Sequence, residues 1–210
     1  MPARRIRFWP HRCRRGRRLQ ERELTSSTPE EPPHVFTLTA ATWVFALLLV
    51  VAGSGKIARP AGTGAALQVV RLPSDARLVR ALGAGEVGLG AAVLALGGPV
   101  PAVLLALTYT GFAVFAERQR RHGGACGCFG TTTTPATALH VWLNLAAAAV
   151  ATGTAVAPGA SLPAVVAADP PQGLLIALVL AVATGVLRLL LTAVPDLHAA
   201  LALAPPRTDA

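Results

Sequence analysis

Long stretches without charged side chains are the feature that most limits the folds open to this sequence. Residues 36–55 form a run of twenty without a charge, and a helix rising ~1.5 Å per residue would carry them across the roughly 30 Å hydrocarbon core of a bilayer. Residues 87–116 form a run of thirty, interrupted by the turn sequence GGPVP at 97–101. Two further stretches, 139–157 and 173–194, contain Arg188 as their one Lys, Arg, Asp or Glu.

The composition agrees with lipid as the solvent of these stretches. Charged residues make up 14% of the chain, against about 25% in soluble domains, and the mean hydropathy is +0.53. A soluble bundle would need amphipathic helices, whereas these stretches are apolar all round. We therefore predict an all-α, polytopic helical membrane protein, a four-helix transmembrane bundle plus a fifth C-terminal transmembrane helix. The expected parts are a disordered tail at 1–34, the four-helix domain at 35–157, a Pro-rich loop at 158–172, the fifth helix at 173–195 and a C-terminal tail at 196–210.

The first residues of the chain are strongly basic. Nine of the nineteen Lys and Arg residues lie in residues 1–22, and a segment this polar buries too little apolar surface to fold alone. Beside a membrane span it predicts contact with anionic lipid rather than nucleic acid. The positive-inside rule then places the N-terminus in the cytoplasm of a multi-pass protein of the cell membrane. The basic residues between Lys56 and Arg80 and near Arg118 favour the opposite orientation, but the first helix and its flank usually dominate.

An up-and-down bundle brings the polar residues within and between the spans to one membrane face. Lys56 closes the first span, Glu86 lies about two turns into the second, and His140 and Asn144 begin the fourth. An ionised side chain inside a span needs a partner, so we expect Glu86 to pair with Lys56, with Arg80 as the second candidate. Such a pair could serve packing or function. Asn144 is expected to make an interhelical hydrogen bond or to contact a substrate.

Two of the three cysteines lie between the third and fourth spans, in the sequence GACGCFG at 124–130; the third, Cys13, is in the basic tail and receives no role. Thr134 is the expected N-cap of the fourth span, with Pro135 at its first position, which leaves Cys126 and Cys128 in an exposed, Gly-rich loop. A disulfide between residues i and i+2 closes a tight ring, and strained disulfides exchange readily rather than act as staples.

Nearby positive charge supports the same interpretation. We expect Arg118, Arg120, Arg121 and His122 to favour the thiolate form of the cysteines. One alternative is a soft-metal site built from His122, Cys126, Cys128 and His140, and another is a pair of free cysteines without chemistry. These alternatives correspond to a metal or small-solute transporter and to a non-catalytic assembly scaffold. For exchange chemistry, an electron route through the membrane would need a quinone or a second thiol pair.

Four segments together resemble the MauE family of methylamine-utilisation membrane proteins, which are grouped with DoxX-like four-helix proteins. They are GSGKIARP at 53–60, RALGAGEVGLGAAVLALGG at 80–98, ACGCFG at 125–130 and TPATALHVWLNLA at 134–146. The resemblance covers residues 36–157. Its matching positions are Lys56, Glu86, Cys126, Cys128, Phe129, Gly130, Pro135 and Asn144.

The resemblance implies a supporting role in the maturation of an exported, disulfide-containing protein, which in the founding members is the small subunit of methylamine dehydrogenase. It also implies a thioredoxin-like partner and an extracytoplasmic cysteine loop. We expect thiol–disulfide exchange by Cys126 and Cys128 rather than a conventional enzymatic reaction. Lys56, Glu86, His140, Asn144, Phe129 and Gly130 are expected to shape the pocket beneath the loop.

Overall fold

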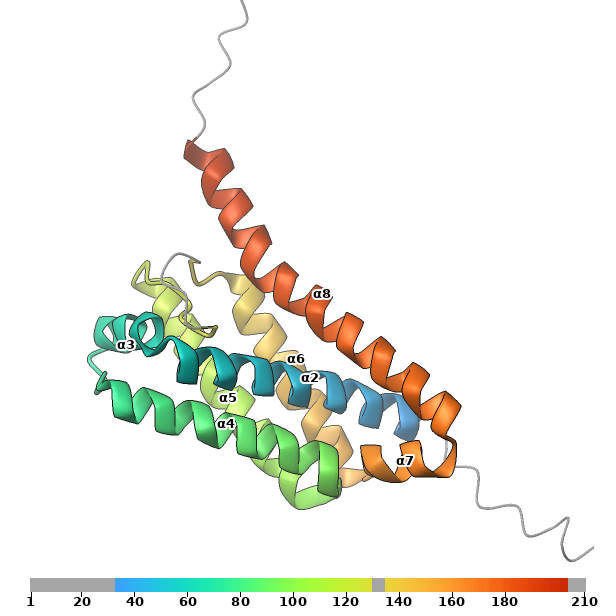
Figure 1. Cartoon of the computed structure of the whole chain (residues 1–210). Coiled ribbons are helices and arrows are strands. Elements are labelled where there is room, and N and C mark those ends of the chain that lie inside the picture. The colour runs from blue at the N-terminus through green and yellow to red at the C-terminus, as the bar shows by residue number, and fades with distance from the viewer. Residues whose placement is uncertain (1–32, 130–134, 204–210) are drawn as a thin grey trace, which may run out of the picture. The chain divides into compact units, whose positions relative to one another are not determined.

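The computed structural model describes residues 33–129 and 135–203 (Figure 1), and throughout these residues the regular secondary structure is helical. The helices are α2 (Pro33–Ala58), α3 (Pro60–Val69), α4 (Ala76–Leu96), α5 (Pro99–Arg121), α6 (Ala138–Val156), α7 (Leu162–Ala168) and α8 (Pro170–Leu203). The predicted all-α class is confirmed. The expected disordered tail through residue 32, Cys13, Gly130, Thr134 and the last seven residues lie outside the described part of the chain.

Five of these helices are long and apolar enough to cross a membrane. They are Val35–Ala58, Ala76–Leu96, Pro99–Arg121, Ala138–Val156 and the Pro170–Val194 part of α8. Large apolar side chains stand exposed along them, Leu107 and Leu174 among them, as expected for surfaces that face lipid. The protein is therefore a multi-pass helical membrane protein.

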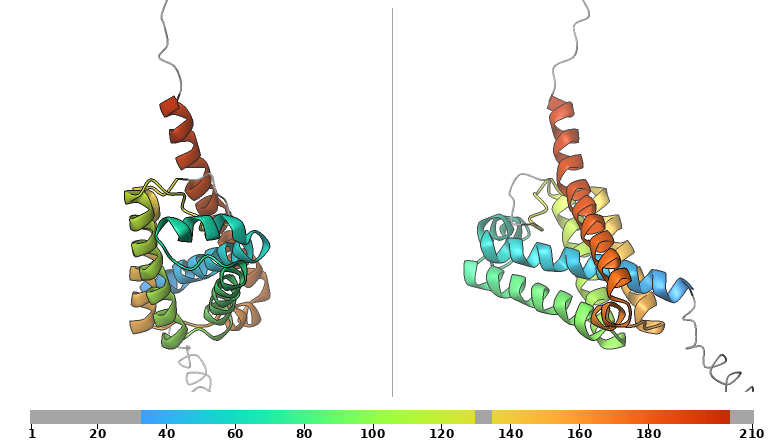
Figure 2. Two further views of the ribbon diagram at one scale, coloured as in Figure 1. Left: turned by 90° about the vertical axis from the view of Figure 1, so that its left-hand side faces the viewer. Right: turned by 45° about the vertical axis from the view of Figure 1, so that its right-hand side comes forward.

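The structure adds helical segments that the sequence analysis assigned to loops or tails. α3 follows the first span directly, with Pro60 at its N-terminus. The short helix α7 lies within the expected Pro-rich loop at 158–172. α8 continues to Leu203, past the expected end of the fifth helix at residue 195, so the expected tail at 196–210 begins as helix. In Figures 1 and 2, α8 runs obliquely along α2, and its last turns extend beyond the other helices.

α2 and α4 pack backbone to backbone through small residues. A Cβ added at Gly53 would lie 2.5 Å from the Gly83 carbonyl oxygen, and one added at Gly90 would lie 2.6 Å from the Ala46 carbonyl oxygen. Small residues that allow this approach are typical of helix interfaces in membranes, where apolar lipid provides no hydrophobic force between helices. The close packing fixes the distance between the polar side chains of α2 and α4.

α5 and α6 form the other closely packed pair, and a buried core joins them to α2. Leu105 of α5 is fully buried in that core. The Tyr109 hydroxyl of α5 donates a 2.7 Å hydrogen bond to the Phe45 carbonyl oxygen of α2. The two rings also pack edge to face, with centroids 5.7 Å apart. Tyr109 therefore ties the two helix pairs together near the middle of the spans.

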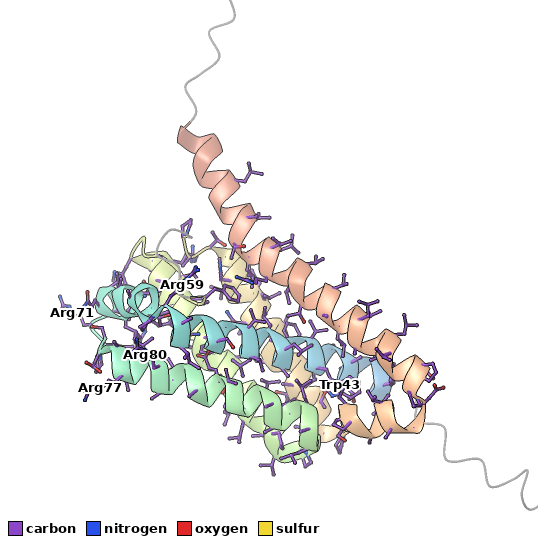
Figure 3. All side chains as sticks on the ribbon, in the orientation of Figure 1. Trp43, Arg59, Arg71, Arg77 and Arg80 are labelled. Atoms are coloured by element: carbon purple, nitrogen blue, oxygen red, sulfur yellow. The ribbon has the colours of Figure 1, made fainter. Side chains whose placement is uncertain are left out.

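The end of the bundle where α2 stops and α4 starts carries α3 and much of the basic charge. Trp43 lies on the other half of α2 (Figure 3). At the α3 end, Figure 3 shows four arginines, two that flank α3 and two in the first turns of α4: Arg59, Arg71, Arg77 and Arg80. The cysteine-containing segment after α5 lies at this same end, because it contacts α3 directly.

Candidate functional site

A cavity of about 360 Å³ lies beneath the cysteine segment. Its walls come from α2, α3, α4, α5, α6 and α8, together with the segment between α5 and α6. Among its lining residues are six of the residues that the sequence analysis assigned to the site: Lys56, Cys126, Cys128, Phe129, His140 and Asn144. The up-and-down topology thus brings together side chains that are up to 88 positions apart in the chain.

Lys56 and Glu86 form a buried ion pair across the α2–α4 interface, as predicted. Lys56 Nζ donates a 2.7 Å hydrogen bond to Glu86 Oε2, and both side chains are at most 5% exposed. Glu86 lies near the middle of α4, deeper than the predicted two turns, because α4 begins at Ala76. Glu86 Oε1 is buried without a hydrogen-bond partner among the described residues. A buried pair of this kind depends on both partners, since either charge alone would be costly in this apolar setting.

Lys56 also connects the ion pair to the cysteine segment. Its Nζ donates a 3.0 Å hydrogen bond to the Cys128 carbonyl oxygen and lies 5.4 Å from the centroid of the Phe112 ring. The backbone of Phe129 comes so close to α2 that a Cβ added at Gly55 would lie 2.8 Å from the Phe129 carbonyl oxygen. The end of α2 therefore supports the cysteine segment from below.

The two cysteines are free thiols with adjacent sulfurs. Their Sγ atoms lie 2.6 Å apart, which is longer than the ~2.05 Å of a disulfide bond. Cys126 is 3% exposed, whereas Cys128 is partly exposed. The expectation of an exposed loop is thus wrong for Cys126, because the segment folds back onto α3 and the cavity. Cys128 is the less buried residue of the two.

The surroundings of the two thiols give them opposite acidities. The hydrogen bond from the Cys126 thiol lowers the pKa of Cys128, and the Lys56 ammonium lowers it further against the effect of burial. The same hydrogen bond raises the pKa of Cys126, and burial adds to this rise. Cys128 is therefore the more acidic thiol of the pair.

Lys56 takes the role that the sequence analysis gave to the basic residues after the third span. Arg120 and Arg121 pair with Glu117 at 2.8 and 2.7 Å, and both are well exposed. Neither they nor Arg118 and His122 contribute to the lowered pKa of Cys128. Lys56 is at least seventy positions away from the cysteines in the sequence but contacts their segment directly, because α2 ends beneath it.

α3 holds the cysteine segment in place. The Thr63 hydroxyl donates a 2.7 Å hydrogen bond to the Gly127 carbonyl oxygen. Gly127 has a φ of +63°, and a Cβ at this position would lie 2.7 Å from the Ala66 Cβ. Glycine is thus required twice at the residue between the cysteines, for its backbone conformation and for its close approach to α3. The buried Gln119 side chain of α5 also bonds to the Ala66 carbonyl oxygen.

α6 begins later than predicted. Its N-cap is Thr137, which forms a capping box with His140, and Thr137 N–H donates a 3.3 Å hydrogen bond to His140 Nδ1. Pro135, the expected first helical residue, instead forms an isolated antiparallel bridge with Ala125. This bridge needs an extended backbone at Pro135, so the helix starts three residues further on. Thr134 is outside the described residues.

His140 and Asn144 lie one above the other on the buried face of α6. Asn144 Nδ2 donates a 2.6 Å hydrogen bond to the His140 carbonyl oxygen, within its own helix rather than to another helix. The expectation of an interhelical bond is therefore not met, and the rest of the amide lines the cavity. His140 is buried and lies beside Leu191 of α8 in the cavity wall.

The alternative metal set is not assembled. Within residues 33–129 and 135–203, no three His, Cys, Asp or Glu side chains come close enough to share a metal ion. His122 is exposed at the C-cap of α5, and His140 is buried at the start of α6, where its Nδ1 is engaged by Thr137. The structure therefore separates the residues from which the sequence analysis built that site.

Sequence reasoning missed the contribution of α3. Proline is favoured at the first position of a helix, so Pro60 could have indicated the start of α3. Thr63 and Gln119 carried no such signal, since a threonine and a glutamine at these places in the sequence are equally suited to a solvated surface. Their burial follows from the way α3 folds over the end of the bundle.

Comparison with known proteins identifies the family of the chain. The family model described as methylamine utilisation protein MauE matches residues 34–158, which is more than half of the sequence. Neither a curated protein nor a solved structure matched the chain. The matched region contains the four spans of the bundle, the ion pair and both cysteines. The chain therefore belongs to the MauE family of membrane proteins.

Proposed function

We propose that this protein supports the maturation of an exported, disulfide-containing protein by thiol–disulfide exchange at Cys126 and Cys128. The observation that carries the proposal is the pair of free cysteines with Sγ atoms 2.6 Å apart, of which the partly exposed one is the more acidic. The thiolate is the nucleophile in disulfide exchange, so acidity and accessibility coincide at Cys128. The buried Cys126 is in position to resolve the product.

The exchange needs two steps. The Cys128 thiolate attacks one sulfur of a client disulfide, which forms a mixed disulfide and releases the other client sulfur as a thiolate. Cys126 then loses its proton and attacks Cys128 Sγ, which closes the Cys126–Cys128 bond and releases the second client thiolate. Both steps are reversible, and the reverse sequence transfers the disulfide from this protein to a reduced client.

The family suggests the class of client and the side of the membrane. By likeness to the MauE description, the client would belong to an amine-utilisation system, with the small subunit of methylamine dehydrogenase as the founding example and a thioredoxin-like exported protein as the direct partner. Disulfide chemistry persists outside the cytosol. The cysteine segment would then face the extracytoplasmic side of the cell membrane, with the basic tail in the cytoplasm against anionic lipid.

Trapping of the mixed disulfide tests this function. In the Cys126→Ser variant the resolving thiol is lost, so Cys128 should accumulate a covalent complex with a thioredoxin-like protein that reductant releases. Cys128→Ser is the matched control and should accumulate at least about tenfold less, because it retains only the thiol with the raised pKa. Equal trapping by both variants, or by neither, would contradict the assignment of Cys128.

Labelling of the thiols in sealed cells tests the orientation and the redox state. A membrane-impermeant maleimide should label Cys128 only after reductant is added, if the pair faces outward and cycles through the disulfide. A cytoplasmic pair that is always reduced would exclude exchange with exported clients. A scaffold predicts that the Cys126→Ser/Cys128→Ser variant still supports client maturation, and that result would also overturn the proposal.

A further inference from the structure

Some residues of the cavity wall are exposed along the membrane spans, and one, Leu72, is exposed in the connection between α3 and α4. Leu82 of α4 and Leu107 and Gly111 of α5 belong to its lining and are also exposed on the outer surface of the bundle. These residues lie within helices that cross the membrane, and α4 and α5 pack much less closely than the α2–α4 and α5–α6 pairs do. A ligand that enters between α4 and α5 would therefore come from the lipid.

Lys56 and Asn144 are the side chains of the cavity wall that can donate a further hydrogen bond. Lys56 Nζ has three N–H groups, of which two are used by Glu86 Oε2 and the Cys128 carbonyl oxygen. The Asn144 amide uses one N–H on the His140 carbonyl oxygen. Among the described residues, no acceptor takes the remaining N–H of either group. Each group can therefore donate one more hydrogen bond, and a ligand with acceptor oxygens would use both.

The rest of the lining suits a flat, apolar ring. Tyr109, Phe112, Phe115 and Phe129 contribute aromatic side chains, and seven leucines and one alanine also line the cavity. The volume of about 360 Å³ is within the range of small-molecule sites. The ligand indicated by these walls is lipid-soluble, planar and equipped with carbonyl oxygens.

We propose that the cavity binds the head group of a membrane quinone, which oxidises the Cys126–Cys128 pair. This inference rests on the proposed exchange function and supplies its oxidant. Both cysteines line the cavity, so a ring held there lies against the thiols. Lys56 and Asn144 would donate to the quinone oxygens, and the Lys56 charge would stabilise the negative charge that develops on the ring oxygen.

The reaction transfers two electrons and two protons. The Cys128 thiolate adds to a ring carbon of the quinone, and a ring oxygen takes up a proton from water, which replaces the one that Cys128 released on ionising. Cys126 releases its proton and attacks Cys128 Sγ, which breaks the carbon–sulfur bond and leaves its electron pair on the ring. The second ring oxygen is protonated, and the products are the Cys126–Cys128 disulfide and a quinol. The disulfide then passes to the client by the exchange described above.

The test uses the reduced, full-length protein in lipid nanodiscs and a short-chain ubiquinone. Quinol formation is followed by absorbance, and free thiols are counted by mass spectrometry after alkylation. We expect one quinol for each pair of thiols lost. The Gly111→Phe variant should reduce the rate at least about tenfold by filling the cavity mouth. A Cβ at Gly111 meets no atom within 4 Å, so this substitution is compatible with folding.

Gly88→Phe is the matched control. Gly88 is exposed on α4, its Cβ position is equally open, and it is not part of the cavity lining. Its quinone reduction should equal that of the unaltered protein. Equal loss in both variants, or no loss in either, would overturn the assignment of the cavity.

Two assays on the unaltered protein separate this inference from the proposed function. Disulfide transfer from the oxidised protein to a reduced thioredoxin measures exchange without quinone. Binding of the short-chain ubiquinone to the Cys126→Ser/Cys128→Ser variant measures the cavity without thiol chemistry.

Disulfide transfer without quinone binding or reduction would leave the exchange function standing and refute the quinone site. Quinone binding without disulfide transfer would support the site and refute the exchange function. Displacement of the quinone by phospholipid alone would identify the cavity as a lipid site and also overturn the inference.

Discussion

The Lys56 ammonium donates a 3.0 Å hydrogen bond to the carbonyl oxygen of Cys128, across 72 positions of the sequence. The contact brings a positive charge beneath the sulfur with the lowered pKa. The charge comes from the end of a membrane span rather than from the basic segment beside the cysteines. Four consequences of this arrangement and of its supports can be measured.

Replacement of Lys56 by Met should raise the pKa of Cys128. Because the pKa is lowered in the unaltered protein, the thiolate persists to lower pH, and its alkylation slows only as the pH falls through that pKa. Without Lys56 the same decline should occur at higher pH. Rates of iodoacetamide alkylation against pH, resolved for each cysteine by mass spectrometry, give the two midpoints. Arg59→Met removes an exposed charge from the same end of the bundle and should leave the midpoint in place.

Lys56→Met should also destabilise the fold, because it leaves Glu86 charged and unpaired in a buried site. Removal of one partner of a buried pair costs about 3–5 kcal/mol, whereas replacement of both by apolar side chains of similar volume is often nearly neutral. Lys56→Met/Glu86→Leu should therefore recover most of the loss. Denaturant unfolding in detergent micelles compares the three proteins. A double variant as unstable as the single one would show that the charge of Glu86 is not the cause.

Gly127→Ala should displace the cysteine segment from α3. The substitution combines a positive φ with a Cβ that would lie 2.7 Å from Ala66. Gly123→Ala is the matched control, since Gly123 has a φ of +64° but open space at its Cβ. The control should lose about 1–2 kcal/mol of stability from the backbone conformation alone, and Gly127→Ala should lose more. Maleimide labelling of the buried Cys126 should rise in Gly127→Ala and not in the control.

Thr63→Val should loosen the same segment more gently. The Thr63 hydroxyl supplies the 2.7 Å hydrogen bond to the Gly127 carbonyl oxygen, and its loss should cost about 1 kcal/mol. Hydrogen exchange at the backbone amides of the cysteine segment should become faster. Thr110→Val removes an exposed hydroxyl that bonds only within its own helix, and exchange in the segment should not change.

Two features could be predicted from the sequence: the membrane spans, and the presence of Lys56, Glu86 and the cysteines at the same end of the bundle. Both depend only on the length of the apolar runs and on the alternating direction of the helices. Charge-free runs of bilayer length fix the helices, and alternation of direction fixes which ends meet. Glu86 therefore needed a cationic partner at a similar depth in the bundle, and the up-and-down topology made Lys56 the nearest candidate. These inferences need no knowledge of individual side-chain contacts.

The details of the cysteine segment depended on contacts that the sequence does not encode locally. α3 packs over the end of the bundle and buries Cys126, so the loop is less exposed than its glycines suggested. The Pro135–Ala125 bridge moves the start of α6 to Ala138, although Thr134 and Pro135 form an acceptable helix-start signal. The arginines after α5 pair with Glu117 three and four residues earlier, which removes them from the sulfurs.

The cysteine segment joins the two closely packed helix pairs at one end of the bundle. It is continuous with α5 and α6, and it accepts hydrogen bonds from Lys56 of α2 and from Thr63 of α3, which follows α2 directly. Tyr109 joins the same two pairs near the middle of the spans. The backbone around the two sulfurs is therefore part of the scaffold of the bundle as well as its candidate reactive site.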